Sequence, residues 1–183
     1  MSRLESISVK SATGGLKETY GAIEGMLGGV PAMFQAIGNS PAALSGYIGT
    51  LTALGSGSLS DKEREAIALA VAETNNCSYC LSAHTALGQG AGMTELETCE
   101  IRFGQIQKPK CKLVAFVLAV LKTKGAVSDT DLEAVRAAGY KDSQITEILL
   151  TIAINYFTNI FNQVNRTVVD FPVVLPGKES ARK

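Results

Sequence analysis

Two cysteines and the chain's single histidine lie close together in the stretch "NNCSYCLSAH", residues 75–84. If this stretch is helical, Cys77, Cys80 and His84 share one face within about two turns, so their side chains can meet. Cysteine reacts as the thiolate, and a neighbouring base promotes its deprotonation. These residue types therefore indicate either thiol chemistry or a site that holds something in place.

The order of the residues favours Cys80 as the nucleophile. Asn75 and Asn76 should end the preceding helix, so the cysteines begin the next one, where free N–H groups and the helix dipole stabilise a thiolate. His84 follows Cys80 by four residues and can serve as its base. Cys77, three residues before Cys80, is placed to close a disulfide on an oxidised Cys80.

Three other interpretations of the motif compete with this one. The cysteines could be small core residues beside a buried histidine. A structural zinc site needs a fourth ligand, which Cys99, Cys111 or a carboxylate would have to supply. A thioredoxin-type redox motif follows a strand, whereas a helix is expected here. Cys99 and Cys111 have no cysteine or histidine neighbour, and we expect both to be inert packing residues.

Helix start and stop signals predict the elements that position the motif. Ser60 with Glu63 and Thr94 with Glu97 have the spacing of capping boxes, and glycines or paired asparagines follow most apolar segments. No run of alternating apolar residues is bounded by hairpin turns. We therefore predict an all-α fold of about eight or nine helices, at residues 16–28, 31–38, 41–54, 61–75, 77–88, 94–104, 110–124, 129–137 and 143–165.

Length and charge limit the domain organisation and the partners. The 183 residues fit one domain. We expect an N-terminal segment at 1–15, a helical domain at 16–176 with its core at 40–125, and a flexible tail at 177–183. Lys plus Arg and Asp plus Glu are 17 each, so no net field attracts nucleic acid or an anionic membrane. The N-terminus lacks the apolar core of a secretory signal, and the longest strictly apolar run, 113–121, is about half a membrane span. A cytoplasmic protein is expected.

The stretch "EAIALAVAETNNCSYCLSAH" resembles the core of the AhpD-like alkylhydroperoxidases, within the carboxymuconolactone decarboxylase superfamily. The family signature is a glutamate, eleven residues, and then Cys-x-x-Cys-x-x-x-His, and it is in register from Glu65. A closer resemblance, to the peroxidase-related branch, extends through "NYFTNIFNQVNRTVVDFP" near the C-terminus. The resemblance implies an AhpD-like helical bundle.

The resemblance also implies roles for individual residues. In such proteins the second cysteine attacks the peroxide, and the first forms a disulfide with the oxidised second cysteine. The resemblance therefore implies that Cys80 is the nucleophile and Cys77 the resolving cysteine, the same roles that the spacing favours. The family histidine and glutamate form a proton relay, here His84 and Glu65. The best-known members carry a second histidine between the cysteines; Tyr79 occupies that position and is a poor base at neutral pH. This difference implies a shorter relay or slower peroxide turnover.

Glu65 has a second interpretation from its position alone. In the first turns of its helix, an exposed carboxylate would simply complement the helix dipole. The run "AIALAVA" that follows is apolar on every side, so the helix should be buried and the Glu65 carboxylate could turn inward. If Glu65 is exposed, Glu73, four residues before Cys77, is the substitute.

We therefore expect a thiol-dependent peroxidase that reduces hydroperoxides with no bound cofactor or metal, using an external dithiol reductant. One alternative is a disulfide reductase that serves a partner peroxidase. Another is a non-enzymatic helical module, either zinc-stabilised or purely structural. The identities of the peroxide and of the reductant are left open.

Composition indicates a homo-oligomer. Hydrophobic residues make up 46% of the chain and the mean hydropathy is +0.17, both high for a lone domain. On the helix expected at 143–165, most of the circumference is apolar and one narrow stripe is polar: Glu147, Thr151, Asn155, Thr158 and Asn162. A central position in the domain could bury the apolar part. A symmetric interface is the other solution, and the resemblance implies a trimer or hexamer.

Overall fold

The computed structural model describes residues 2–103 and 110–177, and in this part of the chain the helices are joined by turns and loops with no strand. The nine helices are α1 (Gly14–Leu27), α2 (Ala32–Ile37), α3 (Pro41–Gly55), α4 (Asp61–Thr74), α5 (Ser78–Gly90), α6 (Glu95–Arg102), α7 (Lys110–Thr123), α8 (Asp129–Ala137) and α9 (Asp142–Asn165). Every boundary lies within two residues of its predicted position. The predicted all-α fold class is confirmed.

The helices begin where their capping residues require. The Ser60 side chain accepts a hydrogen bond from the Glu63 backbone N–H, and the Glu63 carboxylate accepts one in return from the Ser60 backbone. Thr94 and Glu97 form the same reciprocal pair at the start of α6. Each capping box satisfies two backbone donors that the helix leaves unpaired. The starts of α4 and α6 are therefore determined by local sequence.

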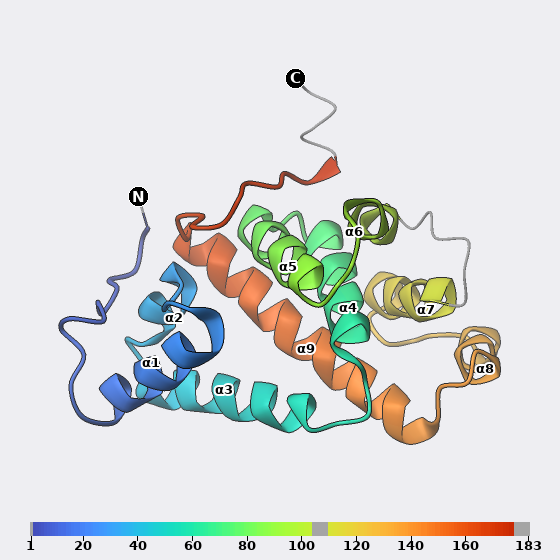
Figure 1. Ribbon diagram of the computed structural model, residues 1–183. Helices are drawn as coiled ribbons and strands as arrows, with labels where there is room; N and C mark the ends of the chain where they lie inside the picture. Colours follow the sequence, from blue (N-terminus) through green and yellow to red (C-terminus); the bar gives the residue numbers. More distant parts are fainter. Residues whose placement is uncertain (1, 104–109, 178–183) are drawn as a thin grey trace.

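Helix α4 lies at the centre of the fold and packs against α5, α7 and α9 (Figure 1). Its residues 66–72 are all buried, as the apolar run predicts. In Figure 1, α9 crosses the molecule diagonally behind α4 and α5, with α1–α3 on one side and α7 and α8 on the other. This arrangement brings the end of α4, the start of α5 and the C-terminal part of α9 together.

The buried face of α9 is largely polar. Ile148 and Ile152 are buried at its N-terminal half, but the stripe that follows is buried as well: Thr151, Asn155, Thr158, Asn159, Asn162 and Asn165. The opposite face is apolar and between 38% and 54% exposed at Leu149, Leu150, Tyr156, Phe157, Ile160 and Val164. None of the described helices, α9 included, is long and apolar enough to cross a membrane.

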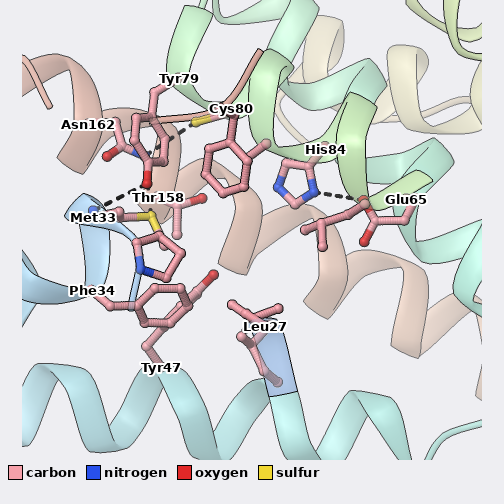
Figure 2. Close-up of a pocket in the computed structure, with 15 residues that line it drawn as sticks. Leu27, Met33, Phe34, Tyr47, Glu65, Tyr79, Cys80, His84, Thr158 and Asn162 are labelled. Atoms are coloured by element: carbon pink, nitrogen blue, oxygen red, sulfur yellow. Dashed lines mark hydrogen bonds and ion pairs between the residues drawn. The ribbon is translucent and has the colours of Figure 1, made fainter. Parts of the chain in front are cut away.

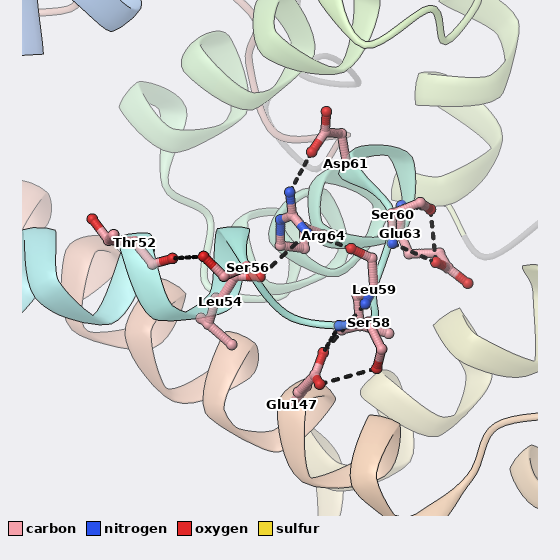
Figure 3. Close-up of polar contacts among 10 residues, drawn as sticks. All are labelled: Thr52, Leu54, Ser56, Ser58, Leu59, Ser60, Asp61, Glu63, Arg64 and Glu147. Atoms are coloured by element: carbon pink, nitrogen blue, oxygen red, sulfur yellow. Dashed lines mark hydrogen bonds and ion pairs between the residues drawn. The ribbon is translucent and has the colours of Figure 1, made fainter.

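A carboxylate on α9 fixes the loop between α3 and α4 (Figure 3). Glu147 accepts hydrogen bonds from the Ser58 backbone (2.8 Å), the Ser58 hydroxyl (3.0 Å) and the Leu59 backbone (3.2 Å). Burial acts to raise the pKa of Glu147, but these three bonds outweigh it and lower the pKa below its ordinary value of 4.5. A Cβ at Gly57 would lie 2.6 Å from the Glu147 carboxylate, so glycine is needed for this approach.

The segment after α9 returns across α5 and α6 (Figure 1). The Val174 backbone donates to the Ser82 hydroxyl at 2.9 Å, and Arg102 donates to the Leu175 carbonyl at 2.7 Å. The Gly177 backbone donates to the Glu73 carboxylate at 2.6 Å. The segment is therefore anchored up to the first residue of the tail predicted at 177–183; residues 178–183 lie outside the described part.

Candidate active site

The turn between α4 and α5 places Cys77 at the start of α5. Asn76 adopts a left-handed conformation with φ of 54°, which asparagine tolerates better than most residues, and so reverses the chain. The Cys77 backbone then donates to the Ala72 carbonyl at 3.0 Å. Cys77 is the N-cap of α5, and its Sγ accepts a hydrogen bond from the Cys80 backbone N–H at 3.2 Å. The prediction that the cysteines begin a helix is confirmed.

Cys77 and Cys80 form an intramolecular disulfide, with their Cα atoms 5.3 Å apart. This separation lies within the normal range for a disulfide, so the oxidised pair closes within one turn of α5. Both residues are only 2% exposed. Reagents must therefore reach the sulfurs through hollows in the surface.

His84 on α5 is bound to Glu65 on α4, with 2.8 Å between Nδ1 and the carboxylate Oε2. The His84 and Glu65 side chains are 18% and 19% exposed. A carboxylate at Nδ1 favours the tautomer with its proton on that nitrogen, which leaves Nε2 free to accept one. In Figure 2 this second nitrogen faces away from Glu65, on the side of Cys80. Glu65 is turned inward, as the apolar run after it indicated.

Cys80 and His84 line one cavity of about 220 Å³ (Figure 2). Most of its wall is apolar or aromatic, with contributions from Leu27, Met33, Phe34, Tyr47, Leu87 and Phe171. Burial, with a further contribution from the charge of Glu65, raises the pKa of Tyr47, which stays neutral. The cavity therefore presents the Cys80 sulfur, which is a thiol once the disulfide is reduced, and the His84 imidazole to a small molecule with a substantial apolar part.

Tyr79, between the two cysteines, is held by structural contacts. Its hydroxyl accepts a hydrogen bond from the Met33 backbone N–H at 3.2 Å, and its ring packs edge-on against Phe171 with centroids 5.9 Å apart. Burial, reinforced by the neighbouring Asp170, raises the pKa of Tyr79 well above its ordinary value. Tyr79 therefore remains protonated at neutral pH and fixes α2 against α5.

Glu73, the substitute proposed for Glu65, is engaged elsewhere. It pairs with Arg102 at 2.8 Å and accepts the Gly177 backbone N–H, and it does not line the cavity. Cys99 on α6 is a free, half-buried thiol that is also absent from the cavity wall. The side chain of Cys111 lies outside the described part of the structure.

The zinc interpretation finds no ligand set in the described residues. Among residues 2–103 and 112–177, no group of three or more His, Cys, Asp or Glu side chains is arranged to hold a metal ion. The two cysteine sulfurs are instead paired in a disulfide, and the His84 imidazole is paired with the Glu65 carboxylate.

Asn162 is a site residue that could not be assigned a role from the sequence pattern alone. Its Nδ2 lies 3.4 Å from Cys80 Sγ and 3.3 Å from Met33 Sδ, and its side chain lines the cavity. The sequence placed Asn162 in the polar stripe of a helix that carries no charge from residue 148 to 165. Buried amides in such a helix are a signal of specific partners.

The two cysteines face different hollows. Cys80 lines the apolar cavity, whereas Cys77 lines a separate, more open depression together with Asn76, Ser78 and Arg166. The walls of this depression are more polar than those of the cavity. The disulfide therefore lies between an apolar cavity on the Cys80 side and a more polar surface depression on the Cys77 side.

Known proteins share the sequence core and the fold. Residues 40–107 match the model of the Carboxymuconolactone decarboxylase family. A peroxidase-related protein with an alkylhydroperoxidase AhpD core from Ralstonia eutropha JMP134 is 22% identical, with 92% of each chain covered and a TM-score of 0.84. A peroxidase-related protein from Silicibacter sp. TM1040 is 20% identical over 92% of this chain and 94% of its own, with a TM-score of 0.77.

A third solved structure has a different activity in its name. It is a cysteine-to-alanine variant of the debrominase Bmp8 in complex with 2,3,4-tribromopyrrole, 16% identical over 93% of this chain and 92% of its own, with a TM-score of 0.79. No curated protein matches the chain. The family match spans the cysteine motif, and the chain shares the fold of the AhpD-core structure, so its core is similar to the AhpD-like proteins of the carboxymuconolactone decarboxylase superfamily.

Proposed function

We propose that the protein is a thiol-dependent peroxidase that reduces hydroperoxides through the Cys77–Cys80 pair. One observation carries this proposal: Cys80 lies in an apolar cavity with His84, whose Nδ1 is bound to Glu65. A nucleophile, a base and a group that orients the base are the parts that activate a weak nucleophile. Two solved proteins with the same fold are named as peroxidase-related, which is consistent with this role.

In the proposed first step, His84 Nε2 accepts the Cys80 proton, and the Glu65 carboxylate stabilises the resulting imidazolium. The Cys80 thiolate attacks the hydroxyl-bearing oxygen of the hydroperoxide, so an S–O bond forms and the O–O bond breaks. The sulfur is oxidised by two electrons, and the leaving alkoxide takes a proton from the imidazolium. The products are a sulfenic acid and an alcohol.

In the second step, the Cys77 thiolate attacks the Cys80 sulfenic acid. A disulfide forms, and hydroxide leaves with a proton as water. An external dithiol then reduces the disulfide, and the depression beside Cys77 offers it a path separate from the peroxide cavity. No step in this sequence uses a bound cofactor or metal. Because Tyr79 is not available as a base, the relay consists of His84 and Glu65 alone.

Steady-state turnover of several hydroperoxides tests the proposal. Hydrogen peroxide, tert-butyl hydroperoxide and cumene hydroperoxide should be compared, with dihydrolipoamide and with thioredoxin as electron donors. We expect catalytic consumption with at least one donor, and faster reaction of the organic peroxides because the cavity wall is apolar. Oxidation no faster than that of an ordinary free thiol would refute a peroxidase function.

A disulfide reductase that serves a partner peroxidase would use the same cysteine pair. The open depression at Cys77 favours this candidate, because a protein disulfide can reach a surface depression more readily than an enclosed cavity. Slow loss of thiols to peroxide together with rapid exchange against a protein disulfide would identify this activity.

The aromatic residues around Cys80 favour reductive dehalogenation as a further candidate. Phe34, Tyr47 and Phe171 line the cavity, and flat aromatic rings pack well against such walls. Bmp8, a debrominase with this fold, was solved with a tribrominated pyrrole. Release of bromide from 2,3,4-tribromopyrrole in the presence of dithiol would support this activity over peroxide reduction.

We also propose that the protein is cytoplasmic and forms a homo-oligomer, a trimer or hexamer; the exposed apolar face of α9 supports the oligomer. Leu149, Leu150, Tyr156, Phe157, Ile160 and Val164 form this face, and large exposed apolar patches mark interfaces. Light scattering coupled to size exclusion at micromolar concentration should give a trimer or hexamer mass. A mass of 19.2 kDa, that of one chain, would contradict the oligomer.

A further inference from the structure

One tyrosine hydroxyl faces the cavity without a hydrogen bond. Tyr47 on α3 is 9% exposed and lines the cavity together with Cys80 and His84. Its hydroxyl has no hydrogen-bond partner among the described residues, and it is not one of the unpaired polar atoms that are sealed from solvent. In Figure 2 the Tyr47 hydroxyl points from α3 into the cavity, toward the side on which Cys80 and His84 lie.

The other two buried tyrosines of the described chain have partners for their hydroxyls. Tyr20 donates to the Ile7 carbonyl at 3.1 Å, and Tyr79 accepts the Met33 backbone N–H at 3.2 Å. A buried tyrosine hydroxyl usually has such a partner. The partner of the Tyr47 hydroxyl is therefore expected to come from a molecule that enters the cavity.

The ring of Tyr47 is held in this orientation by two other aromatic rings. Its centroid lies 5.7 Å from that of Phe34 on α2 and 6.1 Å from that of Phe157 on α9. Burial, and to a smaller extent the charge of Glu65, raises the pKa of Tyr47, so the hydroxyl keeps its proton at neutral pH. Tyr47 therefore offers a pre-oriented O–H donor to the cavity.

The direction of the reaction decides which substrate oxygen this donor meets. When a thiolate attacks a peroxide, the sulfur, the attacked oxygen and the departing oxygen lie nearly in line. The departing oxygen is therefore the one farther from Cys80, and Tyr47 reaches into the cavity from the opposite wall (Figure 2). Negative charge develops on this oxygen as the O–O bond breaks, and a fixed donor directed at developing charge stabilises the transition state.

We propose that Tyr47 is a catalytic residue whose hydroxyl donates a hydrogen bond to the departing oxygen of an organic hydroperoxide. This inference rests on the proposed peroxidase function. As the S–O bond forms and the O–O bond breaks, the electron pair of the broken bond passes to the departing oxygen. The His84 imidazolium supplies the proton that completes the alcohol, and Tyr47 keeps its own proton throughout.

Two oxidants that differ in their departing group test the inference. Cumene hydroperoxide releases an alkoxide, a strong base that depends on stabilisation, whereas peroxybenzoic acid releases benzoate, a weak base that needs little. Each carries one benzene ring. Oxidation of Cys80 by each is measured in a Cys77→Ser background, and mass mapping of the Cys80 peptide excludes other thiols. Both rate constants are divided by the thiolate fraction, which the pH dependence of alkylation by iodoacetamide reports.

In Tyr47→Phe we expect the thiolate-corrected rate with cumene hydroperoxide to fall by about 10- to 100-fold, the equivalent of one hydrogen bond to a charged oxygen. The rate with peroxybenzoic acid should change far less, and the alkylation profile should stay at the parent values. The melting temperature should change little, because no hydrogen bond within the protein is lost. Tyr20→Phe is the matched control: it removes a buried hydroxyl outside the cavity, so it should lower the melting temperature and leave both oxidation rates unchanged.

Three results in Tyr47→Phe would overturn the inference. The first is an unchanged rate with cumene hydroperoxide. The second is an equal loss with both oxidants, which would show that Tyr47 only shapes the cavity. The third is a shifted alkylation profile with unchanged corrected rates, which would show that the hydroxyl binds the Cys80 thiolate instead. Slow oxidation of the parent protein by every hydroperoxide is a different result, because it would refute the peroxidase function itself.

Discussion

Replacing Glu65 with glutamine should slow the reaction at Cys80 without unfolding the protein. The substitution keeps the volume of the side chain and still offers an oxygen to His84 Nδ1. It removes the negative charge that stabilises the imidazolium formed when His84 takes the Cys80 proton. The defect should therefore appear in the rate of proton transfer and peroxide reduction.

The size of the effect follows from the geometry of the contact. The 2.8 Å hydrogen bond joins two side chains that are each less than a fifth exposed, so solvent screens it only partly. Hydrogen bonds to a charged group contribute about 1.5–3 kcal/mol, and neutral ones about 0.5–1.5 kcal/mol. The difference of about 1–2 kcal/mol corresponds to a rate about 5- to 30-fold lower.

Glu73→Gln provides a matched control on the same helix. Glu73 is 14% exposed, pairs with Arg102 and lies away from the cavity. Loss of its charge leaves the Arg102 guanidinium, 8% exposed, without a counterion, which should destabilise the fold by about 1.5–3 kcal/mol. For a chain of this length, that lowers the melting temperature by about 3–12 °C.

The assay combines stopped-flow oxidation of Cys80 by cumene hydroperoxide with calorimetric melting of the reduced proteins. Glu65→Gln should lower the oxidation rate and shift the melting temperature little, and Glu73→Gln should do the reverse. The reasoning is refuted if Glu65→Gln keeps the parental rate, or if its rate loss only parallels a loss of stability equal to that of Glu73→Gln.

Other substitutions test the remaining assignments. Cys80→Ser should abolish peroxide consumption. In Cys77→Ser the reaction should halt at the Cys80 sulfenic acid, which dimedone traps as an adduct detectable by mass spectrometry. The opposite pattern would show that the roles of the two cysteines are reversed. His84→Ala should slow Cys80 alkylation near neutral pH by about 10²–10⁴-fold, and an unchanged pH profile with a much lower melting temperature would make His84 structural. Glu147→Gln should destabilise the protein by about 1 kcal/mol at pH 7. Because the folded pKa of Glu147 is lowered, the stability that its carboxylate contributes is present above the unfolded pKa and is lost as the pH falls through the folded pKa. The difference in melting temperature between the parent and Glu147→Gln should therefore shrink on acidification. A difference that stays constant with pH contradicts the assignment. Gly57→Ala should displace the Glu147 carboxylate and lower the melting temperature to a similar extent.

Helix positions could be predicted from the sequence because their determinants are local. The Ser60–Glu63 and Thr94–Glu97 capping boxes lie within four residues of one another. The approach of Glu65 to His84, nineteen positions later in the chain, depends on how α4 packs against α5. The family spacing predicts this approach, whereas the position of Glu65 in the helix alone favours an exposed carboxylate that complements the helix dipole.

The orientation of α9 could not be predicted from its pattern of side chains. The sequence showed a polar stripe and an apolar remainder, but polar stripes usually face solvent. Here the stripe faces inward, because Asn159 accepts from Asn75 at the end of α4, and Asn162 meets Cys80 and Met33. These partners come from distant parts of the chain. The contact of Asn162 with Cys80 therefore emerged only once the helices were packed.

The inward amides of α9 also restrict how this helix can slide along its neighbours. Two helices that pack only through aliphatic side chains can often shift along each other, because aliphatic contacts have no preferred direction. A slide of one turn, about 5.4 Å, would separate Asn159 from Asn75 and Asn162 from Cys80 and leave these amides unpaired. The position of α9 along its axis is thus defined by specific hydrogen bonds. These bonds keep Asn162 next to the Cys80 sulfur even if the outer apolar face of α9 packs against something else.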